Sequence, residues 1–265
     1  MRMMGSCAVS KTIVRLAVAA CLTAVVGCSA APEGELVRTY QRALEAFDQA
    51  AGPEDYLRAA VLYQEILDRG VVSGALLYNQ GNAYMRAGQR GRAIACYRRA
   101  LAYRPRDPQL HANLQLALGA ESAIRGPRGL LDYVFFWHDW ISYPGKVRAA
   151  AALASLAFAF GILALFVPPR RVFRRAAWGT LVLTVIVAGS AAYDWHRFER
   201  IQRGVVVRAE VVARKGNADS YDPAFTEPLK EGTELRVVER RGAWLQIQLA
   251  GGQTGWVPDA AVTTY

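Results

Sequence analysis

The stretch "YNQGNAYMRAGQRGRAIACYRRALAYRPRD", residues 78–107, decides the fold of the N-terminal half of the chain. Small and aromatic residues alternate in it in the order expected of two antiparallel helices. Gly81 and Ala93 are small enough for the two helices to approach each other closely. Tyr84 and Tyr97 are large enough to fill the space around that contact. The stretch therefore predicts a helix pair that is held together by side-chain packing.

The turn and the end of this helix pair are also marked in the sequence. Gly88, within "RAGQRG", is the expected C-terminal cap of the first helix, and Pro105 stops the second helix. Counted from Gly74, these positions resemble a tetratricopeptide repeat over its full length of about 34 residues. We expect packing roles for Gly81, Tyr84, Ala93, Cys96, Tyr97 and Ala100.

The segments on either side extend the pattern to two repeats and a cap. One repeat length before Ala93 and Tyr97 lie Ala59 and Tyr63, within "YLRAAVLYQEIL". This segment predicts the second helix of an earlier repeat, whose first helix covers about residues 34–51. After Pro105, "DPQLHANLQLAL" predicts a capping helix. The predicted repeat array covers residues 34–120.

The first helices of such repeats form a concave face on which partners bind. The predicted partner-binding residues on that face are Tyr78, Asn82, Met85, Arg86 and Asn113. Asn82 and Asn113 are suited to hydrogen-bond a peptide backbone, and Arg86 is suited to bind a carboxylate. The alternative is that these are solvated side chains without a binding role.

Two uncharged segments follow the array, and the chain as a whole is 53% hydrophobic with a net charge of +10. Residues 149–167 and 176–193 would each reach about 28 Å as helices, close to the thickness of a bilayer core. We therefore predict a two-helix transmembrane hairpin over residues 146–194. The predicted loop, residues 168–175, carries Arg170, Arg171, Arg174 and Arg175. The positive-inside rule places such a loop in the cytoplasm and both flanks outside it.

The N-terminus is typical of an export signal. Residues 1–28 combine basic residues with the short apolar run "LAVAACLTAVV". "VVGC", residues 25–28, resembles a lipobox, in which Cys28 would be acylated. Cleavage after Ala30 and an uncleaved anchor are the alternatives. Each places the rest of the N-terminal region outside the cytoplasm.

Two further segments complete the organisation. Residues 126–145 are rich in aromatic side chains and predict a helix lying in the membrane interface. Residues 204–265 change to short β-branched segments, which predict a small barrel of about five strands. The steps "RKG", "LKEGTELRV", "WLQI" and "GGQTGWV" resemble a bacterial SH3-like domain. Domains of this kind bind peptides or cell-wall fragments in some members and only mediate contacts in others. The residues suited to form an aromatic binding groove are Tyr221, Phe225, Trp244 and Trp256.

Several function classes lack any motif in this sequence. It contains no Gly-rich phosphate loop, no G-x-S-x-G and no H-E-x-x-H, and its cysteines and histidines lack metal-ligand spacing. We therefore expect no enzymatic activity, no cofactor and no metal site. The arginines are spread over the whole chain, and both soluble parts are predicted to be exported, so we expect no nucleic-acid partner.

The order of the segments, with "NQGNAYMRAGQRGRAIACYRRALAYRPRDPQLHANL", resembles the BatE-like proteins of the bacterial aerotolerance operon type. The resemblance implies an all-α tetratricopeptide repeat array, a two-helix transmembrane hairpin and a small all-β SH3-like barrel. It also implies the bacterial inner membrane, with repeats and SH3-like domain both extracytoplasmic. The partners implied are von Willebrand factor A-domain membrane proteins and a MoxR-type ATPase, in the response to oxidative or envelope stress.

Two functions are consistent with the predicted domain organisation. The first is a non-enzymatic membrane scaffold whose repeats dock a protein partner. The second is an envelope sensor whose SH3-like domain binds peptidoglycan or peptides.

Overall fold

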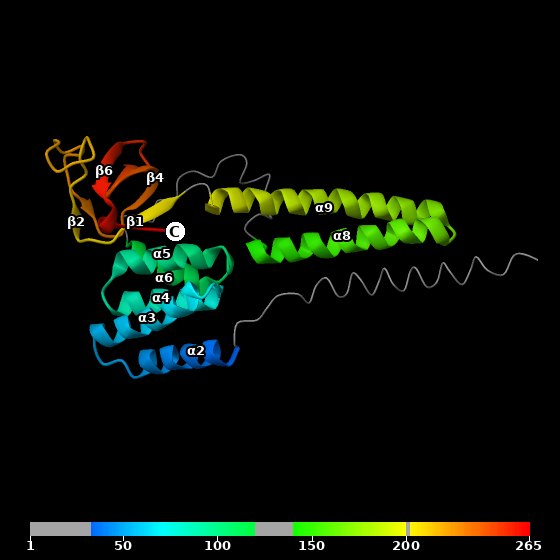
Figure 1. Cartoon of the computed structure of the whole chain (residues 1–265), viewed down its shortest axis with the longest axis horizontal. Helices are drawn as coiled ribbons and strands as arrows, with labels where there is room; N and C mark the ends of the chain where they lie inside the picture. Colours follow the sequence, from blue (N-terminus) through cyan, green and yellow to red (C-terminus); the bar gives the residue numbers. More distant parts are fainter. Residues whose placement is uncertain (1–32, 120–139, 200–201) are drawn as a thin grey trace, which may run out of the picture.

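The computed structural model describes residues 33–119, 140–199 and 202–265 of the chain (Figure 1). These residues form a helical repeat region, a pair of long apolar helices and a small antiparallel sheet. The predicted signal with Cys28 and residues 126–139 of the aromatic segment lie outside the described residues.

The helical repeat region is a stack of antiparallel helices in which each helix packs against the next (Figure 1). Its members are α2 (Glu33–Asp48), α3 (Pro53–Asp68), α4 (Gly74–Arg86), α5 (Arg90–Leu101) and α6 (Pro108–Leu118). The helices α4 and α5 form the helix pair of the quoted stretch. The helices α2 and α3 lie where the earlier repeat is predicted, and α6 lies where the capping helix is predicted.

The helix ends follow from local hydrogen bonding. Ser73 Oγ accepts a hydrogen bond from the Leu76 N–H at 3.1 Å at the start of α4, which satisfies one of the free donors of its first turn. The Asp107 carboxylate caps α6 in the same way. Gly88 follows α4 in the left-handed region with φ of 76°, as expected of a residue that ends a helix.

The core of the repeat region confirms the predicted packing residues. A Cβ atom added to Gly81 would lie 2.5 Å from Cε1 of Tyr97, so only glycine allows α4 and α5 to approach this closely. Tyr97 and Tyr63, one repeat length apart, are both buried. The cysteine and the small residues of α5 are buried as well: Gly91, Ala93, Ala95, Cys96 and Ala100.

The two apolar helices, α8 (Tyr143–Phe166) and α9 (Arg170–Glu199), pack against each other along their lengths (Figure 1). By length and composition each of them could cross a membrane. The predicted loop 168–175 is much shorter in the structure, because α9 already begins at Arg170. Arginine is a good helix former, so the basic residues extend the helix instead of interrupting it. The two prolines, Pro168 and Pro169, end α8.

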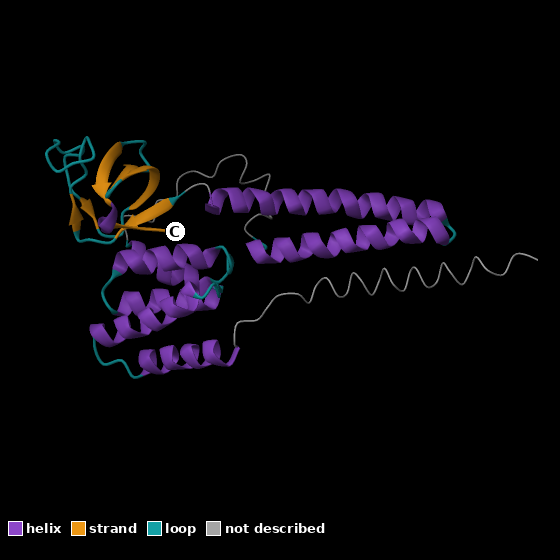
Figure 2. Cartoon of the chain, viewed as in Figure 1, coloured by secondary structure: helices purple, strands orange, loops and turns teal. Residues whose placement is uncertain are grey.

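The C-terminal part is all-β, with every strand pair antiparallel (Figure 2). Its strands are β1 (Arg203–Val206), β2 (Glu210–Val211), β3 (Leu229–Lys230), β4 (Glu234–Arg241), β5 (Trp244–Gln248), β6 (Thr254–Pro258) and β7 (Val262–Thr264). Five strands form one sheet in the order β6-β5-β4-β1-β7, and β2 pairs with β3. Alternate residues such as Leu245 and Ile247 are fully buried, which gives the sheet one apolar face. Closure of this sheet into a barrel stays a prediction.

The sheet packs on the outer side of α5 (Figure 1). Val205 and Val206 are adjacent in β1 and point in opposite directions, as successive strand residues do. Val206 belongs to the core of the sheet, whereas Val205 belongs to the core of the helical repeats. The two hydrophobic cores therefore lie on opposite sides of β1.

Candidate functional site

The predicted partner-binding residues of α4 and α6 lie together in a polar cluster. Asn113 Nδ2 donates hydrogen bonds to Tyr78 Oη at 3.0 Å and to Asn82 Oδ1 at 2.9 Å. The same Asn82 oxygen accepts a hydrogen bond from the hydroxyl of Tyr97 at 2.8 Å. Tyr78, Asn82 and Asn113 are half-buried, so each retains part of its surface toward solvent. The cluster joins α4, α5 and α6 and fixes the position of these side chains.

The cluster still has hydrogen-bonding capacity for a partner. Within the described part of the chain, no group bonds to the amide nitrogen of Asn82 or to the side-chain oxygen of Asn113. An amide donor and a carbonyl acceptor close together match the two groups of a peptide backbone.

The other two predicted residues differ from each other. Met85 is half-buried and packs against the helical core, so it contributes mainly to packing. Arg86 is exposed, and among the described residues it makes no hydrogen bond or ion pair. Its guanidinium group can therefore bind a carboxylate without first breaking an internal contact.

Tyr40 and Asn79, which were not predicted from the sequence, extend this face to α2. Asn79 Nδ2 donates a hydrogen bond to Tyr40 Oη at 3.1 Å, just as Asn113 donates to Tyr78. Asn79 precedes Asn113 by one repeat length of about 34 residues, and this spacing could have identified it. The repeated tyrosine–asparagine bond links the leading helices α2, α4 and α6. We call this surface, made by Tyr40, Tyr78, Asn79, Asn82, Arg86 and Asn113, the leading-helix face.

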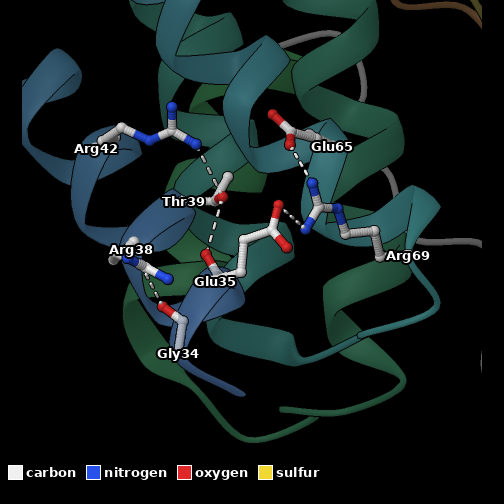
Figure 3. A network of polar contacts seen from close by, with 7 residues as sticks. All are labelled: Gly34, Glu35, Arg38, Thr39, Arg42, Glu65 and Arg69. Carbon is white, nitrogen blue, oxygen red and sulfur yellow. Dashed lines mark hydrogen bonds and ion pairs between the residues drawn. The ribbon is translucent and has the colours of Figure 1, made fainter. Parts of the chain in front are cut away.

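A second polar network ties α2 to α3 (Figure 3). Arg69 binds Glu35 of α2 at 2.9 Å and Glu65 of its own helix at 2.8 Å. The Thr39 hydroxyl donates to the Glu35 carbonyl oxygen and accepts from Arg42, both at 3.1 Å. These contacts satisfy one another and connect neighbouring helices, so we assign them a structural role.

The outer face of α5 is covered by the sheet. The Glu231 carboxylate accepts a hydrogen bond from the Gly91 N–H at 2.8 Å. Helix α5 has no acidic residue in its first turn, and its N-cap residue Gln89 makes no capping bond. Glu231 therefore supplies from the sheet the negative charge that a helix N-terminus favours. A Cβ atom at Gly91 would lie well under 3.0 Å from the Val206 carbonyl oxygen, so the backbones of α5 and β1 are in direct contact here.

An ion pair joins the same two elements about two helical turns further along α5. Arg98 donates two hydrogen bonds to the Glu234 carboxylate, at 2.6 and 2.7 Å, and the hydroxyl of Tyr265 donates a third at 3.0 Å. Burial and then the charge of Glu234 raise the pKa of Tyr265, while Arg98 partly opposes this rise. The outer face of α5 is consequently occupied within the chain itself.

The predicted aromatic residues of the sheet do not form one cluster. Phe225 packs against the buried core, beside Gly255. Trp256 is only 8% exposed, and the Arg241 guanidinium lies over its ring at 5.4 Å. Tyr221 is exposed and lies against Gly216 in a loop.

Trp244 and Trp256 nevertheless share one face of the sheet. Trp256 pairs with Gln246, and Trp244 pairs with Pro258, so the two tryptophans are diagonal neighbours on β5 and β6. Trp244 is half-buried. Ring pairs between described residues join none of the four predicted aromatic residues to another.

The described residues carry little that points to covalent or metal chemistry. No group of three or more His, Cys, Asp or Glu side chains in these ranges could hold a metal ion. Burial raises the pKa of the Cys96 thiol to about 12, so this thiol stays protonated at neutral pH and is a poor nucleophile.

Comparison with known proteins identifies one part of the chain. The family model of the tetratricopeptide repeat matches residues 74–107, which comprise α4, α5 and the segment that leads into α6. The chain thus contains a tetratricopeptide repeat, a unit that generally mediates protein–protein interaction. No curated protein and no solved structure matches the chain.

Proposed function

We propose that this chain is a non-enzymatic, membrane-anchored scaffold of the bacterial cell envelope that binds a protein partner on its leading-helix face. The observation that carries the proposal is the contrast between the two sides of the repeat. The outer side of α5 is covered by the sheet through Gly91 and Arg98. The leading-helix face keeps the exposed Arg86 and the unused hydrogen-bonding groups of Asn82 and Asn113.

Membrane anchoring is supported by the surface of α8 and α9. Large apolar side chains are exposed along both helices, among them Leu156, Phe158, Leu165, Phe166, Leu181, Val182, Val185 and Ile186. So much apolar surface is unfavourable in water, and a lipid bilayer covers it. The repeat region precedes α8 and the sheet follows α9, so both lie at the same end of the hairpin (Figure 1). The arginines at the other end favour a cytoplasmic turn and extracytoplasmic repeats.

Contacts at the base of the hairpin would hold the repeats in a fixed position at the membrane surface. The Tyr143 N–H, in the first turn of α8, donates a hydrogen bond to the Ala102 carbonyl oxygen at 3.1 Å. The Arg106 guanidinium lies over the ring of Trp140 at 5.2 Å. These contacts connect the end of the repeat directly to the start of the first apolar helix. A partner that docks on the repeats would therefore lie close to the membrane.

We further propose a BatE-like role in an aerotolerance or stress-type membrane complex of the inner membrane. The order of repeats, apolar helix pair and all-β part supports it, together with the resemblance of the repeat segment. The proposed partners are von Willebrand factor A-domain membrane proteins and a MoxR-type ATPase, and the proposed C-terminal domain is SH3-like. Acylation of Cys28 belongs to the same proposal.

The proposal is tested by purifying the full-length chain from its own host in mild detergent and identifying bound proteins by mass spectrometry. The test variant carries Asn82→Ala, Arg86→Ala and Asn113→Ala, and the control carries Arg208→Ala, an exposed residue between β1 and β2. We expect A-domain membrane proteins with the wild type and the control, and at least about tenfold less with the test variant. Equal recovery with all three chains would contradict the proposal.

A second candidate is an envelope sensor whose SH3-like domain binds peptidoglycan or peptides. The half-buried ring of Trp244 beside Trp256, and the exposed Tyr221, favour it. Binding of purified murein to the full-length chain, lost on Trp244→Ala but kept on Arg86→Ala, would support this candidate over the scaffold.

A further inference from the structure

The turn of the apolar hairpin carries four arginines whose side chains have no partner among the described residues. Arg170, Arg171, Arg174 and Arg175 are all exposed, and no side-chain hydrogen bond or ion pair joins them to another described residue. They occupy the first two turns of α9, where the helix dipole is positive and disfavours cations. Four like charges in this position favour the binding of anions.

Helix geometry places these arginines on one side of α9. At about 100° per residue they cover an arc of about 140°. The residues of α9 that are covered by α8 lie on the other side, as the reduced exposure of Phe173, Thr180 and Ala191 shows. The middle of the arginine arc is about 140° away from these residues, so the arginines project away from α8.

The same side of α9 continues as an aromatic and then an apolar stripe. Trp178 lies one helical turn below Arg174 and is 62% exposed. Val182 and Val185 follow on this side, and Val185 is 64% exposed. The order of cationic, aromatic and aliphatic side chains corresponds to the headgroup, interface and hydrocarbon layers of a bilayer.

The opposite end of the hairpin fixes the depth of the arginines. Lys146 of α8 and Asp194 of α9 form a buried ion pair at 2.7 Å near the start of α8 and the end of α9. The helix between Arg175 and Asp194 rises by about 28 Å, close to the thickness of the hydrocarbon core. The arginines therefore lie at the level of the phosphate groups when the hairpin spans a bilayer.

We propose that Arg170, Arg171, Arg174 and Arg175 form a binding site for the phosphate groups of anionic phospholipids in the leaflet around the turn. The guanidinium group binds phosphate oxygens in pairs, and the outward arc allows several lipids to bind at once. The ring of Trp178 lies beneath these headgroups, at the level of the glycerol esters. This assignment rests on the proposed membrane anchoring of the chain.

The test reconstitutes the full-length chain into nanodiscs of equimolar phosphatidylglycerol and phosphatidylcholine, and counts retained lipids by native mass spectrometry. One variant replaces the four arginines by glutamine and another by lysine. Arg148→Gln, at the opposite end of the hairpin, is the matched control. We expect the wild type and the control to retain phosphatidylglycerol over phosphatidylcholine by about tenfold. The preference falls below about twofold in the glutamine variant and is largely kept in the lysine variant.

An equal preference in the wild type and the glutamine variant would overturn the proposal. Release of the lipid by millimolar inorganic phosphate would also overturn it, because the site would then be one for small anions. Discs of pure phosphatidylcholine separate this proposal from the anchoring itself. A wild type that enters these discs but shows no lipid preference in the mixed discs contradicts only the lipid site, whereas failure to enter any disc contradicts the anchoring as well.

Discussion

Arg98 and Glu234 lie 136 residues apart in the chain and form a two-bond ion pair between α5 and β4. This pair, with the bond from Glu231 to the Gly91 N–H, joins the repeat region and the sheet into one unit. This arrangement matters for function, because the sheet already covers α5, the outer helix of the repeat. A partner therefore cannot bind on that side of α5.

Removal of one side of this pair should loosen the interface. Glu234→Gln is expected to lower the free energy of unfolding by about 1–2 kcal/mol, since the carboxylate also accepts from Tyr265. Because both side chains of the ion pair are about one third exposed, a double-mutant cycle with Arg98→Gln should give a coupling of only about 1 kcal/mol. Thermal unfolding of the full-length chain in detergent measures both. A coupling near zero would show that the pair adds nothing to docking.

The change in the free energy of unfolding caused by Gly91→Ala independently tests whether the sheet packs on α5. Alanine normally stabilises a helix by up to about 1 kcal/mol relative to glycine. At residue 91 its Cβ would clash with the Val206 carbonyl oxygen, so we expect a loss of about 2 kcal/mol. Gly34 is the matched control, since it is also the second residue of a helix but has open space around it. Gly34→Ala should be neutral or stabilising, and equal effects at both positions would argue against the docked sheet.

The buried pair of Lys146 and Asp194 should be needed for hairpin stability. Both side chains are almost fully buried, so Asp194→Ala removes the carboxylate and leaves a buried ammonium group. We expect a loss of about 3–5 kcal/mol. The double variant Lys146→Met with Asp194→Leu should recover most of it, because no buried charge remains. Unfolding of the hairpin by denaturing detergent measures this, and a double variant as unstable as Asp194→Ala would contradict the expectation.

Tyr265 should make the interface sensitive to alkaline pH. Its pKa is raised in the folded chain, first by burial and then by the charge of Glu234. A tyrosine in the unfolded chain ionises near pH 10, so the stabilising contribution is complete below about pH 10 and is lost as the pH rises above it. Between about pH 8 and about pH 10.5, the unfolding temperature should fall less in Tyr265→Phe than in the wild type. Equal decreases in both chains would exclude a contribution from Tyr265.

The repeat could be predicted because its defining contacts are local. Gly81 and Tyr97 are close in the sequence, and the spacing of small and large residues encodes their contact directly. The length of α9 could not be predicted in the same way. Arginine occurs in loops as well as in helices, so the two arginine pairs of residues 170–175 did not show whether this segment is a loop or the start of α9.

The site was only partly predictable. Asn82 and Asn113 were both predicted to bind a peptide backbone, and the structure brings them together. The covered side of α5 was missed because Glu231 reaches Gly91 across 140 residues, a separation that no periodicity encodes. Similarly, Phe225 packs in the core beside Gly255, whereas the Trp256 ring lies under Arg241, and motif spacing alone does not encode this difference.

The most direct test of the scaffold is site-specific photocrosslinking in the native host. A photoreactive amino acid replaces Arg86 on the leading-helix face in one chain and Arg208 in the loop between β1 and β2 in another, since both residues are exposed. We expect a crosslink to a single membrane-protein partner from residue 86 and none from residue 208. A crosslink to that partner from residue 208 alone would contradict binding on the leading-helix face.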